Sequence, residues 1–433
     1  MSKLKNFCHV PFRELYIEHN SFNITVDRDK GKRFRVNDKI EEYVNPNENS
    51  GGYRSCCVQD ISHKGTISDH PLDAPDNWFN TNAELNKTRE LFLKDKRPSN
   101  CAHCWIKEDR GLESSRQKEN WKYENKFRKV EPTDVPELEV LDIRLSNKCN
   151  LQCKMCYSGN SDQIAKNIVN ATKAGAIKNN EYWQSFNAEY FKDSGNLDPV
   201  KGIYEFIIAN KGIRELRFAG GESFVMPEVE ELLVKLINIG RTNLFIFFLT
   251  NCTTVKTNVL NLLKKFDNVE VCCSIDGTGK WIEYQRYPTR WETVKRNYVK
   301  LLNNGMETSL SPCWSHLNIL GLPDFLEWAI DSNPINIIGY GEVTDDVATS
   351  YLHWSLVPLK YRTEMIKKLD TIDLSNIDLE ADYYDIANRL RTEVRNITDD
   401  ERTKLNENVK LWDFNNPVKY RDMFPWASEL LGE

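Results

Sequence analysis

Along the middle of the chain, short apolar runs of strand length alternate with longer segments in which apolar residues recur every three or four positions. Apolar runs of this kind are typical of strands covered on both faces, and the longer period is typical of helices that pack on them. We expect six strands, at 138–145, 215–219, 244–250, 269–275, 307–311 and 335–339. We expect helices between them at 227–239, 255–266, 291–304 and 322–331.

This order predicts an α/β fold with a parallel sheet, because a helical crossover between successive strands makes neighbouring strands parallel. A sheet of this kind, closed or nearly closed, carries its functional side chains at the carboxyl ends of the strands. The pattern predicts a small α+β module before the sheet, with helices at 83–94 and 107–129, and a helical C-terminal cap after it, with helices at 359–369 and 386–394. The expected domains are 1–135, 136–345 and 346–433.

Composition excludes several classes of protein. Of the 433 residues, 40% are hydrophobic and 11% aromatic, which is enough for a buried core and excludes wholesale disorder. The net charge of −6 gives no electrostatic case for a general nucleic-acid binder. No apolar run reaches the roughly 20 residues of a membrane span, and no apolar stretch follows the N-terminus as in a signal peptide. We therefore expect a cytoplasmic protein with no membrane partner.

Cysteine is the informative residue type. Of twelve cysteines, seven fall in three tight groups: Cys56/Cys57, Cys101/Cys104 and Cys149/Cys153/Cys156. In a reducing cytoplasm, clustered cysteines are more often metal ligands than disulfides. The last group follows the first expected strand with the spacing Cys-x3-Cys-x2-Cys. Three thiolates in a compact loop can hold three irons of a [4Fe-4S] cluster and leave the fourth open. A structural zinc is the alternative, but it needs four ligands, and no fourth Cys or His lies nearby in sequence.

This loop, in this position, resembles that of radical S-adenosylmethionine (radical SAM) enzymes, and the resemblance covers about 138–342. It implies a partial (β/α)6 barrel, with SAM chelated at the open iron of a cluster on the catalytic cysteines Cys149, Cys153 and Cys156. Reductive cleavage of SAM would yield methionine and a 5′-deoxyadenosyl radical. The resemblance also implies that Met155 and Tyr157 together contact the adenine.

Three further segments carry the same resemblance, and each has an ordinary alternative. Gly220, Gly221 and Glu222 end the second strand and would bind the SAM ammonium, although paired glycines are also common in turns. Ser274 and Asp276 would bind the ribose hydroxyls, although Asp-Gly is an ordinary turn. The remaining two residues are Arg286, which would pair with the SAM carboxylate or form a surface salt bridge, and Asn318, a weaker match near SAM or the substrate.

The N-terminal cysteines resemble the SPASM/Twitch auxiliary-cluster module, here placed before the core instead of after it. The resemblance implies a second [4Fe-4S] cluster on Cys8, Cys56, Cys101 and Cys104. The glycine spacing leaves Cys57 open as the alternative to Cys56. Four thiols that close a small module also suit structural zinc.

The predicted function is that of a radical SAM oxidoreductase or maturase that abstracts a hydrogen atom from its substrate, with the auxiliary cluster aiding electron transfer. A reductant such as flavodoxin or ferredoxin is the implied partner. Peptide or protein modification is favoured. The alternatives are a dehydrogenase of a small alcohol, a non-catalytic zinc or iron–sulfur interaction protein, and an electron carrier that does not use SAM.

Overall fold

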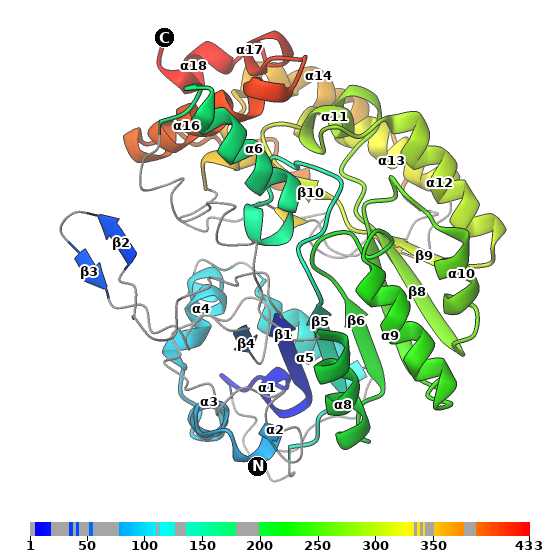
Figure 1. Ribbon diagram of the computed structural model, residues 1–433. Helices are drawn as coiled ribbons and strands as arrows, with labels where there is room; N and C mark the ends of the chain where they lie inside the picture. Colours follow the sequence, from blue (N-terminus) through cyan, green and yellow to red (C-terminus); the bar gives the residue numbers. More distant parts are fainter. Residues whose placement is uncertain are drawn as a thin grey trace.

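A computed structural model describes the chain at residues 5–18, 34–37, 40–42, 52–54, 78–109, 111, 113–125, 136–178, 199–332, 336–337, 341–342, 350–375 and 387–433. Its centre is an eight-stranded sheet with the order β11-β9-β8-β7-β6-β5-β1-β4 (Figure 1). The six strands expected from the sequence form its larger part, and every neighbouring pair among them is parallel. They are β5 (Val140–Arg144), β6 (Glu215–Phe218), β7 (Phe245–Thr250), β8 (Asn268–Cys273), β9 (Glu307–Leu310) and β11 (Asn336–Ile337). The predicted α/β fold is confirmed.

The sheet continues into the N-terminal part of the chain. Strand β1 (Glu14–Glu18) pairs in parallel with β5, and Glu14 lies opposite Val140. Strand β4 (Gly52–Arg54) then pairs with β1 in antiparallel orientation. The sequence analysis did not predict this pairing. The sheet therefore crosses the expected domain boundary near residue 135, which stays a prediction.

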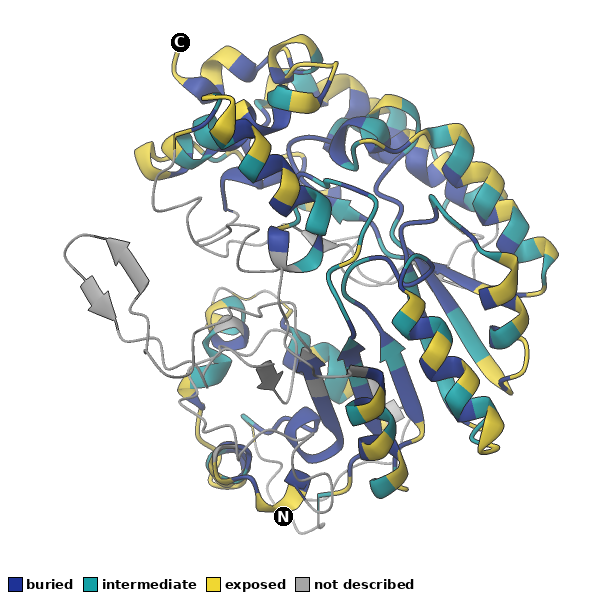
Figure 2. Cartoon of the chain, in the orientation of Figure 1, coloured by how far each residue is buried: buried dark blue, intermediate teal, exposed yellow. Residues whose placement is uncertain are grey.

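Helices cover one face of the sheet. They alternate with the strands, and in Figure 2 helices α9, α10 and α12 turn buried residues inward and exposed residues outward. On α9, Leu232, Leu233 and Leu236 are fully buried, as expected for an apolar stripe facing a core. The helices of this region are α6 (Asp162–Lys173), α8 (Pro199–Ala209), α9 (Pro227–Asn238), α10 (Thr257–Leu263), α11 (Gly279–Gln285), α12 (Trp291–Asn303) and α13 (Leu322–Ser332).

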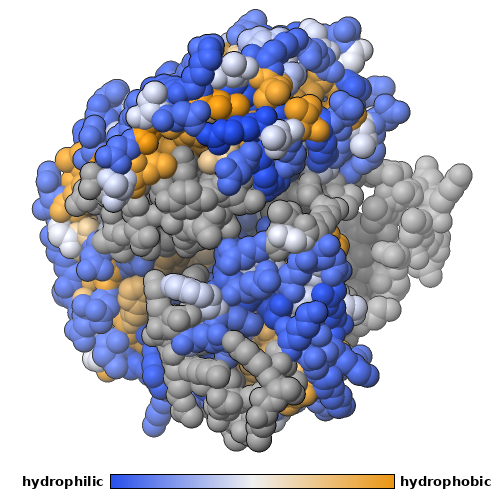
Figure 3. Space-filling view, turned by 180° about the vertical axis from the view of Figure 1, so that it is seen from behind, coloured by the Kyte–Doolittle hydropathy of each residue, from blue (hydrophilic) through white to orange (hydrophobic). Residues whose placement is uncertain are grey.

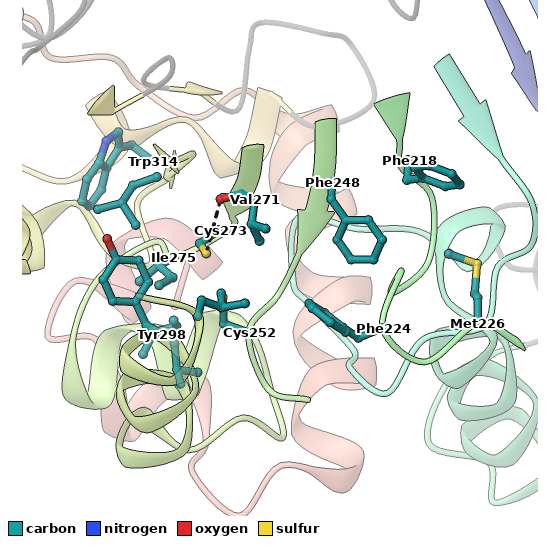
Figure 4. Close-up of a cluster of buried hydrophobic side chains, with 14 of the residues drawn as sticks. Phe218, Phe224, Met226, Phe248, Cys252, Val271, Cys273, Ile275, Tyr298 and Trp314 are labelled. Atoms are coloured by element: carbon teal, nitrogen blue, oxygen red, sulfur yellow. Dashed lines mark hydrogen bonds between the residues drawn. The ribbon is translucent and has the colours of Figure 1, made fainter. Parts of the chain in front are cut away.

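The core between these helices and the sheet is aromatic and dense (Figure 4). The Phe248 ring lies 4.9 Å from the Phe224 ring and 5.9 Å from the Phe218 ring, measured between centroids. Cys252 and Cys273 pack in the same core, and the Cys273 thiol donates to the Val271 carbonyl at 3.8 Å. These two thiols therefore pack as core residues.

The other face of the sheet is less completely packed. Along β7, Phe245, Phe247 and Leu249 are half-buried, while the residues between them are buried. In register with these positions, Asp142 of β5 and Arg217 of β6 are also half-buried. Because side chains alternate between the two faces of a strand, this polar and aromatic row marks a distinct inner face.

The N-terminal part joins this inner face through charged groups. The Glu14 carboxylate accepts a hydrogen bond from Tyr123 at 2.8 Å and lies 3.1 Å from the Arg217 guanidinium of β6. The N-terminal elements also include a small antiparallel pair, β2 (Phe34–Asn37) and β3 (Ile40–Glu42). The helices are α1 (Val10–Arg13), α2 (Trp78–Thr81), α3 (Ala83–Leu93), α4 (Ala102–Asp109) and α5 (Ser115–Asn125).

The C-terminal region is helical, as expected, and lies beside α6 and α11 at the top of Figure 1. Its helices are α14 (Leu359–Leu369), α16 (Asp399–Asn415), α17 (Tyr420–Met423) and α18 (Ala427–Leu431). The sequence did not predict α16, whose first turn is closed by a capping box between Thr398 and Glu401. Within the helix expected at 386–394, the described part is helical only at 387–389.

The polar character of the surface agrees with the composition of the chain. The rear view in Figure 3 is mostly hydrophilic, with hydrophobic residues in scattered groups. In the part of the chain that the structure describes, none of the helices combines the length and the apolar character that crossing a membrane requires.

A short parallel pair, β10 (Cys313–Trp314) with β12 (Gly341–Glu342), completes the described strands.

Candidate functional site

The three-cysteine loop follows β5 directly, at the carboxyl edge of the sheet. Cys149, Cys153 and Cys156 are free thiols, and each is half-buried. Burial, together with the charges of the nearby Glu222 and Cys156, raises the pKa of Cys149 to about 12. Burial also raises the pKa of Cys153, to which the charges of Cys156 and Cys149 add. The three thiols therefore lie close enough to influence one another's ionisation.

This donor set suits a cluster in which each thiolate binds a different iron. Among the described residues, no group of three or more His, Cys, Asp and Glu side chains is arranged to hold a single metal ion. The loop supplies three soft thiolate ligands, the type that selects iron–sulfur clusters and zinc. The residues present therefore fit a [4Fe-4S] cluster with one iron left for another ligand.

The Gly-Gly-Glu turn after β6 is built against the backbone of this loop. The Gly221 amide donates to the Ser146 carbonyl at 3.3 Å, and the Glu222 amide donates to the Lys148 carbonyl at 2.8 Å. A Cβ at Gly221 would lie 2.1 Å from the Lys148 carbonyl oxygen, and Gly220 has a φ of +99°. Both glycines are thus required here by the close approach of the cysteine loop.

The Glu222 carboxylate is buried and bound to protein groups. It accepts hydrogen bonds from the Thr250 hydroxyl at 2.7 Å, the Asn251 amide at 2.6 Å and the Phe224 amide at 3.1 Å. Burial raises the pKa of Glu222 to about 7, although these three donors oppose the shift. A carboxylate offers about four acceptor positions, so little capacity remains. Glu222 joins the carboxyl ends of β6 and β7, and its role toward SAM stays a prediction.

Asp276 and Arg286, both expected to contact SAM, bind each other. The Arg286 guanidinium donates to the two Asp276 oxygens at 2.5 Å and 2.8 Å. Asp276 is fully buried and also accepts from the Gln285 amide group at 2.8 Å and the Cys313 backbone amide at 2.9 Å. All four acceptor positions of Asp276 are therefore occupied.

The same arginine faces the cysteine loop. Its Nη1 lies 4.0 Å from the Cys153 sulfur. Burial lowers the pKa of Arg286, but the stronger combined effect of Asp276 and Cys153 raises it well above its ordinary value. A guanidinium has five N–H donors, so Arg286 still has N–H donors left after its contacts with Asp276 and Cys153.

Asn318 belongs to the network around Asp276. Its amide donates to the Asp276 carbonyl at 2.7 Å and to the Cys313 carbonyl at 2.9 Å, and its oxygen accepts from the Ser315 amide at 2.8 Å. Asn318 is fully buried. Ser274, in contrast, is half-buried at the carboxyl end of β8, and its amide donates to the Thr250 carbonyl at 2.8 Å.

The two residues expected at the adenine differ in exposure. Met155 is half-buried and packs against the main core. Tyr157 is 38% exposed. Each of the remaining predicted SAM contacts also lies at the carboxyl ends of β6–β8 or in the segments that follow, so the structure brings the expected residues to one edge of the sheet.

Sequence analysis missed Lys154, inside the cysteine loop. Its amide donates to the Gln285 carbonyl at 2.8 Å, and its ammonium lies over the rings of Tyr284, Tyr287 and Trp412. Lys154 is only 4% exposed. Burial lowers the pKa of Lys154 to about 7, against the opposing charges of Asp413 and Cys153. The sequence signal was a lysine between two ligand cysteines, which alone does not reveal partners far away in the chain.

The N-terminal thiols also come together. Cys8 and Cys104 are buried and Cys101 is half-buried. Burial raises the pKa of Cys8, and Cys101 and Cys104 raise it further by their charges, while Arg116 opposes them. Cys56 and its alternative Cys57 lie outside the described residues. Around the thiols pack Phe7, Val10, Phe12, Phe92 and Trp105.

A comparison with protein-family models agrees with this geometry. Residues 143–331 match the family model described as Radical SAM superfamily. Among solved structures, Streptococcus suis SuiB bound to precursor peptide SuiA is 16% identical, with 57% of this chain and 49% of that chain covered and a TM-score of 0.36. Native anSMEcpe with bound AdoMet and Cp18Cys peptide is 15% identical, with coverages of 58% and 64% and a TM-score of 0.38.

A sequence identity this low says nothing about the substrate of this chain. The chain also spans only about half the length of SuiB. No curated protein matches the sequence. The family match instead includes the end of β5, the cysteine loop and the Gly-Gly-Glu turn. Over residues 143–331, which is less than half of the 433 residues, this chain is therefore similar to the radical SAM superfamily.

Proposed function

We propose that Cys149, Cys153 and Cys156 hold a [4Fe-4S] cluster that serves reductive cleavage of SAM. When bound, the cluster supplies an electron that splits SAM into methionine and a 5′-deoxyadenosyl radical, which abstracts a hydrogen atom from the substrate. The observation that carries the proposal is the placement of three free thiols in one loop at the carboxyl edge of the sheet. The protein's task is to position SAM and substrate and to exclude water.

The proposed SAM site lies along the carboxyl ends of β5–β8. Gly220, Gly221 and Glu222 would receive the ammonium, and Arg286 would use its remaining N–H donors for the carboxylate. Ser274 is the best placed candidate for the ribose because it is half-buried at a strand end. Asp276 and Asn318 would act by shaping this edge, since protein groups already engage their polar atoms. Met155 and Tyr157 would contact the adenine.

We propose a peptide or protein substrate, held against the inner face of the sheet. The half-buried row on this face includes the aromatic side chains of Phe245 and Phe247, so it offers contacts for apolar side chains of such a substrate. A small alcohol is the second candidate. Reaction of the reconstituted enzyme with deuterated candidate substrates would decide between them, because deuterium would appear in 5′-deoxyadenosine only with the true class.

The N-terminal thiols support a second proposed cluster. Cys8, Cys101 and Cys104 lie close together in one packed unit, and Cys56, or Cys57, would complete four ligands. This cluster would aid electron transfer, while flavodoxin or ferredoxin would be the external reductant. Structural zinc is the alternative, and metal analysis after anaerobic purification separates the two.

The test of the SAM-cleaving function is electron paramagnetic resonance (EPR) of the reduced protein with and without SAM. The proposal expects a [4Fe-4S] signal that SAM alters, because SAM binds directly to the open iron. A signal that SAM leaves unchanged would favour an electron carrier. A protein that binds zinc and no iron would favour an interaction protein.

A further inference from the structure

The cysteine loop is attached to the rest of the protein on the side of Lys154. Two of its backbone amides donate to the end of α11 and the residues just after it: Lys154 to the Gln285 carbonyl at 2.8 Å, and Gln152 to the Tyr287 carbonyl at 2.6 Å. The Tyr287 hydroxyl in turn donates to the Asn415 carbonyl at the end of α16, at 2.8 Å. The loop is thus connected, through one short segment, to the C-terminal helix.

The Lys154 side chain makes the second connection. Its ammonium lies 5.4 Å from the ring centroids of Tyr284 and Tyr287 and 5.8 Å from that of Trp412. A cation over an aromatic face within about 6 Å is attracted by the ring quadrupole, and the attraction strengthens when the pair is desolvated. The rings of Tyr284 in α11, Tyr287 just after it and Trp412 in α16 thus surround this ammonium, and the charges of Asp413 and Cys153 also act on it.

The neighbouring ligand also packs on the C-terminal region. Cys156 contacts a small apolar cluster that includes Ile164 and Ile168 of α6 and Leu411 of α16. The Asn167 side chain of α6 donates to the Leu411 carbonyl at 3.3 Å. Helix α16 therefore supports the cysteine loop from behind, at Cys156 as well as at Lys154.

We propose that Lys154 is a positioning residue of the cysteine loop. Inserted between Tyr284, Tyr287 and Trp412, it pins the loop to α16 and holds a buried amino group on the residue next to Cys153. In its protonated form this group stabilises the reduced form of the cluster, which carries one more negative charge than the oxidised form, since burial and nearby charge set cluster potentials. This inference rests on the proposed cluster, and it makes the C-terminal region part of the cluster site.

Three substitutions of Lys154 separate its attachment of the loop to α16 (the pin) from the effect of its charge on the cluster. Lys154→Ala removes both, Lys154→Met keeps an apolar chain among the rings but removes the charge, and Lys154→Arg keeps both. Trp412→Leu removes one wall of the site without altering the loop. Lys235→Met is the matched control, because Lys235 lies over the Tyr204 ring at 5.5 Å on the helical layer, away from the loop.

The pin is tested without any cluster, by hydrogen exchange of the loop amides in the metal-free protein. Lys154→Ala and Trp412→Leu should exchange about tenfold faster at Gln152 and Lys154 positions, which is about 1.4 kcal/mol, within the range of a desolvated cation–π contact. Lys154→Arg and Lys235→Met should exchange like the wild type. So should Lys154→Met, because its sulfur makes contacts with aromatic rings of similar strength to the lost cation–π contact. Unchanged exchange in Lys154→Ala would overturn the pin.

The charge is tested by the midpoint potential of the EPR signal that SAM alters. Lys154→Met should shift it to more negative values, while Lys154→Arg and Lys235→Met should leave it in place, which a purely structural role would not produce. An unchanged potential in Lys154→Met would overturn the electrostatic part. A wild type without a SAM-sensitive signal would overturn that part together with the proposed function, while the exchange experiment still decides the pin.

Discussion

Replacement of Gly221 by alanine tests how closely the Gly-Gly-Glu turn and the cysteine loop must approach. An alanine Cβ would lie 2.1 Å from the Lys148 oxygen, 2.7 Å from the Lys148 carbonyl carbon and 3.0 Å from the Asn147 carbonyl carbon. All three atoms belong to the backbone, so no side chain can turn away. To reach ordinary contact, the turn and the loop must separate by roughly 1 Å.

The separation acts on the site more than on the fold. Overpacking of this kind costs about 1–3 kcal/mol of stability, and it breaks the amide contacts of Gly221 and Glu222 with the loop. Because Cys149 follows Lys148 directly, the shift moves a ligand. A misplacement of about 1 Å can reduce catalysis about 100-fold. We therefore expect Gly221→Ala to fold but to form 5′-deoxyadenosine about 100-fold more slowly.

The assay compares 5′-deoxyadenosine formation with dithionite, SAM-dependent EPR changes and chemical denaturation. Gly240→Ala is the control, because its φ of +74° imposes strain while nothing lies within 4 Å of the added Cβ. That strain costs about 1–2 kcal/mol, so the control loses similar stability but keeps its activity. If Gly221→Ala cleaves SAM as fast as Gly240→Ala, the close approach has no functional role.

The remaining predictions concern stability and metal content. Asp276→Asn removes the buried anion beside Arg286 and should cost about 3–5 kcal/mol in denaturant unfolding; a loss under 1 kcal/mol, roughly, would contradict a tight pair. The pKa of Glu222, about 7 against an ordinary 4.5, means that its protonated form is favoured in the fold. The contribution of protonated Glu222 to the free energy of unfolding is therefore complete below about pH 4.5, and it is lost as the pH rises through about 7. Glu222→Gln should remove this pH-dependent loss of stability, which amounts to up to about 3 kcal/mol. If the free energies of unfolding of the metal-free variant and wild type change in parallel with pH, the raised pKa of Glu222 is refuted. Thr398→Ala removes the cap of α16 and should lower the free energy of unfolding by about 1 kcal/mol. An unchanged free energy of unfolding would mean that packing alone holds the helix. Cys8→Ser should remove about four irons per chain and leave the SAM-sensitive signal in place, whereas loss of zinc instead would assign a structural metal.

The barrel strands and the cysteine loop were accessible from the sequence because their signals are local. Apolar runs such as 244–250 indicate a buried strand without knowledge of its neighbours, and the cysteine spacing is read within eight residues. The pairing of β1 with β5 was not accessible, because it joins segments more than 120 residues apart. Helix α16 was missed because its sequence, DDERTKLNENVKLWDFN, is mostly polar.

The site shows the same division between local and distant information. The sequence brought Asp276 and Arg286 to one edge of the sheet, but their spacing did not reveal that they would bind each other. Glu222 was expected to face a ligand, and its partners at Thr250 and Asn251 come from a neighbouring strand. Lys154 depends on Trp412, which lies in a different region of the chain. Such contacts follow from tertiary packing and carry no local signature.

The most direct test of the central claim is iron and sulfide content after anaerobic reconstitution, combined with 5′-deoxyadenosine formation after dithionite. Wild type is compared with the Cys149/Cys153/Cys156→Ala variant. The account predicts that about four irons per chain are lost in the variant and that only wild type forms 5′-deoxyadenosine. Equal iron content in the two proteins, or 5′-deoxyadenosine from the variant, would contradict it.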